Sequence, residues 1–184
     1  MVHRAAGAIV LLLATLLLQG CLSPVESIDE GQLDVLEAEA GYLLIAVDTN
    51  FNLDQIKLGG RKYLSLNRDD LQHGTNFILA RVPAGKYRII SVHLNFLYAF
   101  KLDDENWRFE VTPGVVSYVG HLNVQNRLRN MTARIELENR SSEALEFLES
   151  NFPHLIDSEE VRYAGPGEDD FFLYVRSLER GAGE

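Results

Sequence analysis

The chain is poor in cysteine and in positive charge, and both shortages narrow what it can do. Cys21 is the only cysteine among 184 residues, so the protein can form no intramolecular disulfide. If this single cysteine is itself covalently modified, no thiolate remains in the chain for catalysis or for metal binding. The 17 Lys and Arg residues are outnumbered by 27 Asp and Glu residues, which gives a net charge of −10. This balance repels the phosphates of nucleic acid and of anionic lipid head groups, and we expect no nucleic-acid partner.

The motifs of common hydrolases are also missing. The sequence has no Gly-x-Ser-x-Gly elbow, and Ser91 and Ser117, the serines near histidines, lie in apolar runs typical of strands. A paired-carboxylate site needs a cleft, and short strands joined by short turns offer little concave surface. We therefore expect no enzymatic activity and no cofactor.

The first twenty residues have the layout of a secretory signal peptide. His3 and Arg4 precede an apolar run from Ala8 to Leu18, and the small residue Gly20 stands directly before Cys21. The alternative is a transmembrane helix. The apolar stretch is shorter than the roughly 20 residues that a spanning helix needs, which favours the signal peptide.

Residues Leu18-Gln19-Gly20-Cys21 resemble the lipobox of bacterial lipoproteins. The resemblance implies cleavage between Gly20 and Cys21, a diacylglycerol on the Cys21 thiol and usually a further acyl chain on its amine. Several acyl chains make a stable anchor, because each buried methylene adds about 0.8 kcal/mol of membrane affinity. Leu22 in place of Asp implies, by the sorting rule of that family, retention in the outer membrane facing the periplasm. Gln19 departs from the small residues that the family prefers.

The composition divides the chain into four segments. Residues 1–20 form the signal peptide, and residues 21–40 are predicted to be a polar, lipidated tether in which a short helix can form at about 29–38. Residues 41–140 carry the strand signals, and residues 141–184 form a C-terminal helix and extension. The mature length of 164 residues (184 less 20) is sufficient for one domain with a sizeable core.

Short apolar runs separated by turn signals predict a mainly β domain. Pro83-Ala84-Gly85 and Thr112-Pro113-Gly114 separate consecutive runs, and Gly85 and Gly114 are expected to take positive φ there. About seven short strands within roughly a hundred residues predict an antiparallel β-sandwich. The clearest runs are Tyr42–Val47, Phe77–Val82, Tyr87–Leu94, Trp107–Val111, Val115–Val124 and Thr132–Glu138.

Two turns share a Pro-Gly pattern: Val82-Pro83-Ala84-Gly85-Lys86-Tyr87, and Phe109-Glu110-Val111-Thr112-Pro113-Gly114, which is followed by Tyr118-Val119-Gly120. The pattern resembles that of bacterial lipoproteins of unknown function with a transthyretin-like or carboxypeptidase-regulatory-like sandwich. The resemblance covers roughly residues 41–140 and implies a transthyretin- or immunoglobulin-like sandwich in the cell envelope. It implies no catalytic residue, because a fold alone does not define a function.

The C-terminal extension differs in character from the strands before it. Ser142 can cap a helix that Asn151-Phe152-Pro153 ends. The final apolar segment, Phe171–Leu178, fits an edge strand or a short helix. The aromatic residues of the extension either cap the core, which is the favoured interpretation, or offer a surface to a partner; they are Phe147, Phe152, Phe171, Phe172 and Tyr174.

Three residues are candidates for a metal site. If the strands at 115–124 and 132–138 pair so that their inward-facing residues match, His121 lies opposite Glu136. His93 stands late in its own strand, and two histidines with a carboxylate can bind zinc. The alternative is a partly exposed pair between His121 and Glu136 across two strands.

The sequence therefore predicts a lipid-anchored envelope protein that acts as a binding or structural module. Two alternatives stay open. One is an assembly subunit of an envelope-spanning machine such as a secretion system, and the other is a metal or ligand sensor built on His93, His121 and Glu136. The expected partners are the membrane, through Cys21, and an envelope protein.

Overall fold

The structure is a computed structural model that describes residues 22–28, 38–127 and 132–181. The predicted signal peptide, the predicted lipidation site Cys21 and nearly all of the helix considered at 29–38 lie outside these ranges. Within the described ranges, no helix has the length and the apolar character that crossing a membrane requires.

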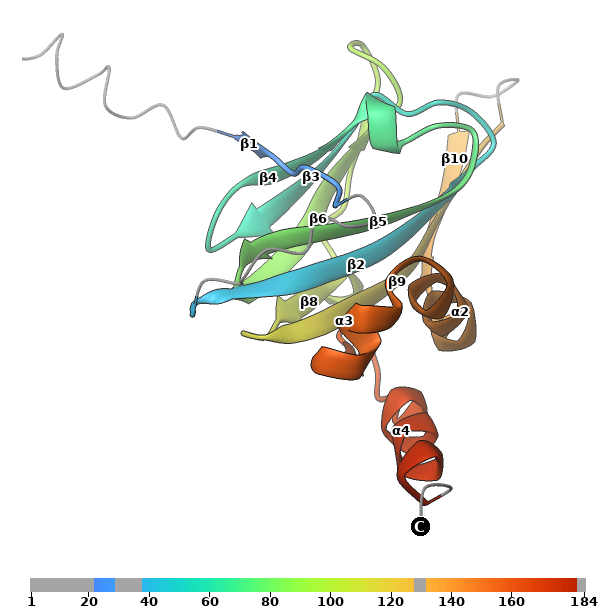
Figure 1. Ribbon diagram of the computed structural model, residues 1–184. Helices are drawn as coiled ribbons and strands as arrows, with labels where there is room; N and C mark the ends of the chain where they lie inside the picture. Colours follow the sequence, from blue (N-terminus) through green and yellow to red (C-terminus); the bar gives the residue numbers. More distant parts are fainter. Residues whose placement is uncertain (1–21, 29–37, 128–131, 182–184) are drawn as a thin grey trace, which may run out of the picture.

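The strands form two sheets, which enclose a shared core (Figure 1). Sheet A has the order β1 (Ser23–Pro24), β4 (Leu64–Asn67), β3 (Gln55–Gly60), β6 (Gly85–His93) and β7 (Ala99–Lys101), and β8 (Arg108–Val111) also pairs with β6. Sheet B has the order β10 (Thr132–Glu138), β9 (Val115–Arg127), β2 (Ala40–Thr49) and β5 (Gly74–Pro83), and β11 (Glu160–Tyr163) also pairs with β9. Two short 3-10 helices, η1 (Arg68–Asp70) and η2 (Glu105–Trp107), connect strands.

The prediction of a mainly β domain is confirmed, whereas the prediction of purely antiparallel pairing is wrong. β2 pairs antiparallel with β5 but parallel with β9, and β9 also pairs parallel with β11. β1 runs parallel to β4. Tight turns can join only antiparallel neighbours, so turn signals reveal hairpins but not parallel pairs that form between distant segments.

The core between the sheets is built from alternate residues of facing strands. Leu43 and Ile45 of β2 face Ile56 and Leu58 of β3 in this cluster, and all four side chains are fully buried. Intervening residues of β2, such as Leu44, are buried on the opposite side, in a second cluster with the C-terminal helices. Burial on both faces explains why β2 is continuously apolar rather than alternating.

Two helices, α2 (Ser141–Asn151) and α3 (Pro153–Ser158), lie against the outer face of sheet B, and α4 (Phe171–Gly181) lies beyond them and packs Phe172 into the same cluster (Figure 1). The segment Phe171–Leu178 is therefore helical. Phe152 and Phe172 are buried against sheet B, and Phe147 stacks on Phe77 with ring centroids 4.4 Å apart, whereas Tyr174 is exposed. Most aromatic residues of the C-terminal extension therefore cap a core, which was the favoured interpretation.

The predicted Ser142 cap is wrong. The α2 helix begins at Ser141, whose backbone N–H donates to the Asn139 side-chain oxygen at 3.0 Å. The acceptor thus stands two residues before the helix, in the turn after β10, where it satisfies one of the unpaired donors of the first turn.

A bulge in β9 changes which side chains face the helices. Leu44 pairs with Tyr118 and Ile45 pairs with Gly120, so Val119 is an extra residue, and Gly120 has φ of +128°. One extra residue reverses the alternation of side chains along a strand. Tyr118 and His121 consequently point to the same side, toward the helices.

The predicted register between β9 and β10 is also wrong. His121 lies opposite Glu138, and Glu136 lies opposite Asn123. A shift of two residues keeps every side chain on its face, so the matching of inward-facing residues could not distinguish this register from the predicted one.

Candidate functional site

The segment directly after the predicted lipidation site is docked on the domain. The Ser23 N–H donates to the Tyr63 carbonyl at 3.0 Å, the Val25 N–H donates to β4 at 2.9 Å, and the Ile28 N–H donates to β5 at 2.8 Å. The Val25 side chain is buried in the core between the sheets. Residues 22–28 are termed the strap. The prediction of a free tether is wrong for the strap.

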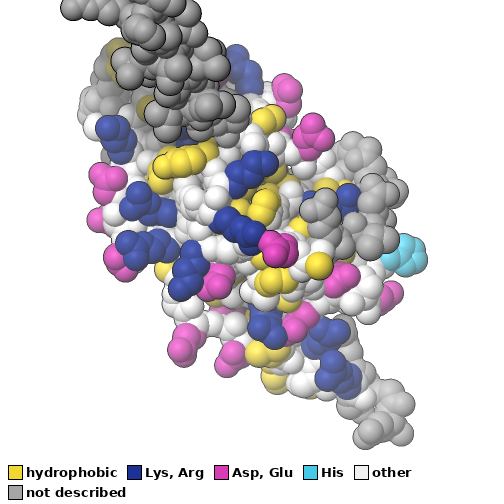
Figure 2. Space-filling view, turned by 90° about the vertical axis from the view of Figure 1, so that its left-hand side faces the viewer, with side chains coloured by type: hydrophobic (Ala, Val, Ile, Leu, Met, Phe, Trp, Pro, Cys, Tyr) yellow, Lys and Arg dark blue, Asp and Glu magenta, His cyan; other side chains and the backbone are white. Residues whose placement is uncertain are grey.

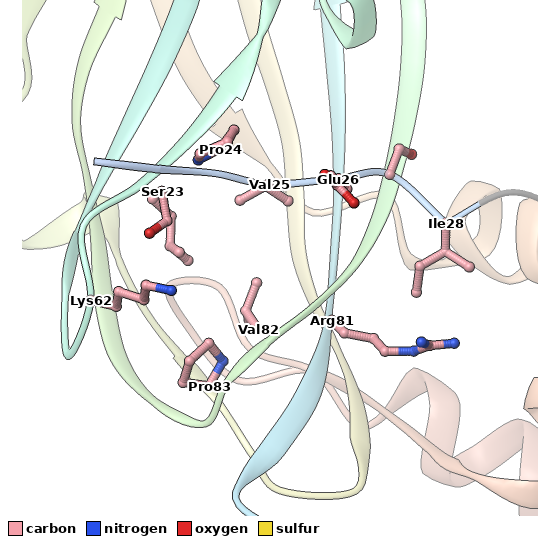
Figure 3. A pocket seen from close by; sticks show the side chains of 11 residues that line it. Ser23, Pro24, Val25, Glu26, Ile28, Lys62, Arg81, Val82 and Pro83 are labelled. Atoms are coloured by element: carbon pink, nitrogen blue, oxygen red, sulfur yellow. The ribbon is translucent and has the colours of Figure 1, made fainter. Parts of the chain in front are cut away.

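The strap bridges sheet A and sheet B at the edge formed by β4 and β5. A cavity of about 610 Å³ lies beside it, between the strap, the β3–β4 turn and the end of β5. Figure 3 shows the strap crossing the two sheets, with Lys62 of the turn and Pro83 of β5 below it. The strap therefore begins beside the β3–β4 turn.

The outer face of sheet A carries an open pocket of about 630 Å³. Gly59 and Gly60 contribute only backbone to its wall, and a Cβ at Gly60 would collide with the carbonyl oxygen of Lys86. This close approach of β3 to β6 is what requires a glycine. The remaining lining residues are four that carry a cation, one that carries a carboxylate and four that are uncharged: Lys86, Arg88, Lys101, Arg108, Asp103, Tyr63, Tyr87, Ile90 and Ser91.

Three of the four cations are not neutralised. Within the residues that the structure describes, Lys86, Arg88 and Lys101 form no ion pair, whereas Arg108 contacts the Glu105 carboxylate at 2.9 Å. Uncompensated cations around one pocket raise the local potential and attract anions. Guanidinium and ammonium groups bind phosphate and carboxylate oxygens through charge-assisted hydrogen bonds. The pocket is thus suited to an anionic group.

Charge is distributed unevenly over the molecule. Residues 55–67 and 84–111, which build most of sheet A and its turns, contain seven Lys and Arg against four Asp and Glu. Residues 141–181, which form the helical layer, contain three Lys and Arg against ten Asp and Glu. Figure 2, viewed from the side of β1 and β4, shows several Lys and Arg side chains in the left half and the centre of the view, with Asp and Glu side chains among them. The charge of these sheet A segments is therefore opposite in sign to the net charge of the whole chain.

His121 is fully buried between sheet B and α2. Its Nδ1 lies 2.7 Å from the Tyr118 hydroxyl oxygen, which also accepts the Arg140 backbone N–H at 3.2 Å. No acceptor other than Nδ1 is within hydrogen-bond distance of the Tyr118 O–H among the described residues, so the O–H donates to Nδ1 and the ring proton lies on Nε2. Nε2 has no hydrogen-bond partner among the described residues and lies 3.4 Å from the Glu143 carboxylate.

The protonation of this cluster follows from its burial. Desolvation lowers the pKa of His121, although the Glu143 carboxylate opposes the shift, and desolvation raises the pKa of Tyr118. Both groups are therefore neutral at pH 7. A neutral, inaccessible pair of this kind joins α2 to the sheet rather than binding a ligand.

The structure does not bring the three predicted metal ligands together. His93 lies on sheet A, where its Nε2 is 3.1 Å from the Ser91 hydroxyl, and its pKa is lowered mainly by desolvation. Glu136 forms an ion pair with Arg134 at 2.7 Å on the edge strand β10. Across the described ranges, no group of three or more His, Cys, Asp or Glu side chains is arranged to hold a metal ion.

Comparisons with family models, curated proteins and solved structures give no match. The assignment of the site therefore rests on its geometry. The basic pocket was not predicted from the sequence, because its cations come from β6, β7 and β8 and converge only in the folded sheet. One signal was present: Lys86 and Arg88 are two residues apart in a strand and so share one face.

Proposed function

We propose that this protein is a lipid-anchored module of the bacterial cell envelope that binds an anionic group through sheet A and performs no catalysis. The Leu18–Cys21 motif supports the anchor, and Leu22 supports retention in the outer membrane. The positive φ angles of Gly85 (+150°) and Gly114 (+66°) support the two Pro-Gly turns on which the transthyretin-like assignment rests.

The docked strap is the observation that carries the proposal. Ser23, two residues after Cys21, is hydrogen-bonded to Tyr63 in the turn that precedes β4. Consecutive Cα atoms are about 3.8 Å apart, so a lipid on Cys21 is tethered within roughly 8 Å of Ser23. A flexible tether lets a domain move away from the bilayer, whereas a docked segment keeps it close.

Analysis of the mature N-terminus tests the anchor. Mass spectrometry of the protein purified from membranes should show a chain that begins at Cys21 and carries acyl chains, and globomycin should block its maturation. Cys21→Ser should give no acylated form, with Ser23→Ala as the control that leaves acylation intact. A mature chain with an unmodified Cys21 thiol would contradict the proposal.

A second candidate is an assembly subunit of a larger envelope machine. The α4 helix supports it, because Leu173, Tyr174 and Leu178 expose large apolar side chains on the helical layer. Such a face is suited to a protein partner. Crosslinking in intact cells from Leu173 should then recover one defined envelope protein, and recovery of only lipids and abundant porins would exclude this candidate.

A further inference from the structure

We propose that the outer face of sheet A lies on an anionic phospholipid surface, with the tip of the β6–β7 hairpin inserted among the head groups. The inference rests on the proposed function, since the lipid on Cys21 brings the domain to the bilayer. It goes further by naming the ligand class, the orientation and a second point of membrane contact.

The tip of the β6–β7 hairpin is apolar and exposed. Phe96, Leu97 and Tyr98 are consecutive, and their exposed fractions are 87%, 69% and 46%. Adjacent exposed side chains of this size mark contact surfaces, because they gain free energy when they leave water. The membrane interface suits this combination, since Phe and Leu enter the apolar region while the Tyr hydroxyl stays hydrated.

Two backbone N–H groups of the tip are paired within the hairpin. The Asn95 side-chain oxygen accepts the N–H groups of Leu97 and Tyr98 at 2.9 and 3.0 Å, and the Leu94 N–H donates to the Tyr98 carbonyl at 2.9 Å. An unpaired N–H group is costly to move out of water. Because Asn95 pairs these donors in advance, the tip can approach lipid with a reduced desolvation penalty.

The same sheet provides charge complementarity. Lys86, Arg88 and Lys101 are free of ion pairs in the described part of the chain, and they surround the pocket on the outer face of sheet A. Basic residues near an anionic leaflet are attracted to its phosphates. The helical layer, with ten acidic residues against three basic ones in 141–181, is repelled by that leaflet. Attraction of sheet A and repulsion of the helical layer therefore favour the same orientation, with sheet A toward the bilayer.

The anchor and the tip lie at opposite ends of sheet A. The strap begins at the β3–β4 turn, which adjoins the pairing of Gly60 with Tyr87, whereas the tip follows His93. His93 is six residues after Tyr87 along β6, which corresponds to about 20 Å at roughly 3.3 Å per residue. The cations of the pocket lie along this span. Contact at both ends therefore lays the basic face flat on the bilayer.

The apolar residues of α4 provide a matched contrast. Leu173 is 50% exposed and Leu97 is 69% exposed, so the two leucines are similarly available to solvent. Leu173 belongs to the acidic layer on the other side of the molecule. If exposure alone decided membrane contact, both positions would insert; in the proposed orientation only Leu97 does.

Site-specific labelling of the lipidated protein tests the proposal. Cys21 is the only cysteine and its thiol carries the lipid, so Leu97→Cys or Leu173→Cys introduces a single free thiol for an environment-sensitive fluorophore. Each protein is reconstituted into vesicles of phosphatidylethanolamine with phosphatidylglycerol and into vesicles of phosphatidylcholine. We expect a blue shift and several-fold stronger quenching by brominated acyl chains at position 97 than at position 173, in the anionic vesicles.

Charge reversal tests the electrostatic part in the same system. Arg88→Glu combined with Lys101→Glu should reduce quenching at position 97 several-fold and remove the difference between the two lipid compositions. Equal quenching at positions 97 and 173 would overturn the proposed orientation. Equal quenching at position 97 in both lipids would overturn the role of anionic phospholipid. A tip that stays aqueous on vesicles but is protected in intact cells would indicate a protein partner and overturn the lipid assignment.

Flotation of the same samples separates the two proposals. Protein that floats with the vesicles while position 97 stays aqueous leaves the lipid anchor in place and rejects the inference. Protein that lacks acyl chains on Cys21 and does not float rejects the proposed function.

Discussion

The outer faces of the two sheets differ in their charge and in whether helices cover them. Sheet B is covered by α2 and α3, with α4 beyond them, and this layer buries Leu148 and Phe172 and encloses His121. Sheet A has no comparable cover within the described residues, and its cations surround an open pocket. The polar groups on the outer face of sheet B therefore stabilise the fold, whereas those on the outer face of sheet A are available for contact with another molecule.

Removal of a buried side chain from the covered face should have the largest effect. Leu148 of α2 is fully buried against sheet B, so Leu148→Ala should destabilise the domain by about 2–5 kcal/mol. Leu173→Ala, at an exposed position of α4, should stay within about 0.5 kcal/mol. Urea denaturation of a form that begins at Leu22 measures both, and equal midpoints would show that the helical layer is not packed on sheet B.

The bulge that directs His121 toward the helices should be the next most sensitive feature. Gly120 has positive φ, and a Cβ there would lie 2.9 Å from the Glu138 carbonyl oxygen. Gly120→Val should destabilise by about 2 kcal/mol or more, because strain and collision add. Gly114→Val should lose only about 1 kcal/mol, since φ is positive there but nothing lies within 4 Å. Equal melting temperatures for Gly120→Val and Gly114→Val would contradict the bulge at Gly120.

The buried histidine predicts a pH dependence for the covered face. The pKa of His121 is lowered in the folded state, so below about pH 6.5 the unfolded chain binds a proton that the folded protein does not. Stability should therefore fall as the pH falls below about 6.5, by up to about 1.4 kcal/mol per pH unit, until the folded pKa is reached. His121→Gln should reduce this dependence of the free energy of unfolding on pH, which urea denaturation at a series of pH values measures.

His93 is the matched control for that series. It stands half-buried on sheet A, and its pKa is lowered in the same direction. His93→Gln should reduce the pH dependence of the free energy of unfolding less than His121→Gln does, because the His93 ring is more hydrated. A larger effect at His93 than at His121 would reverse the assignment of the buried titrating group.

The smallest effect on stability is expected on the bare face. Arg88→Glu and Lys101→Glu each change a surface cation that has no ion pair within the described ranges, so stability should stay within about 0.5 kcal/mol. Binding to anionic vesicles should fall and lose its dependence on salt concentration. Strong destabilisation in urea would show that these cations serve the fold.

The sequence predicted the strands that are long and apolar, and it missed those that are short or polar. β2 and β5 follow from the runs at Tyr42–Val47 and Phe77–Val82, whereas β3 (Gln55–Gly60) contains two glycines and a lysine and gives a weak strand signal. The end of α2 was predicted from Asn151-Phe152-Pro153, but α3 was missed, because Pro153 ends one helix and also begins the next.

The site residues were harder to predict for a physical reason. The strand pattern assigned His121 the wrong partner on β10, because a register shift of two residues keeps every side chain on its face. The bulge at Gly120, which brings Tyr118 and His121 to the same side, was not predicted. The strap was taken for a tether, because Val25 is the only apolar residue in Ser23–Ser27 and burial of one side chain gives no periodic signal. The prediction for Cys21 rests on its motif alone, and the residue lies outside the described ranges.

Amide hydrogen exchange of the lipidated protein, compared between detergent and anionic vesicles, tests the contrast between the two faces most directly. The account predicts that vesicles slow exchange at Phe96–Tyr98 and in β7 of sheet A and leave α2 and α4 unchanged. Slowed exchange in the helices, with an unchanged β6–β7 hairpin, would contradict it.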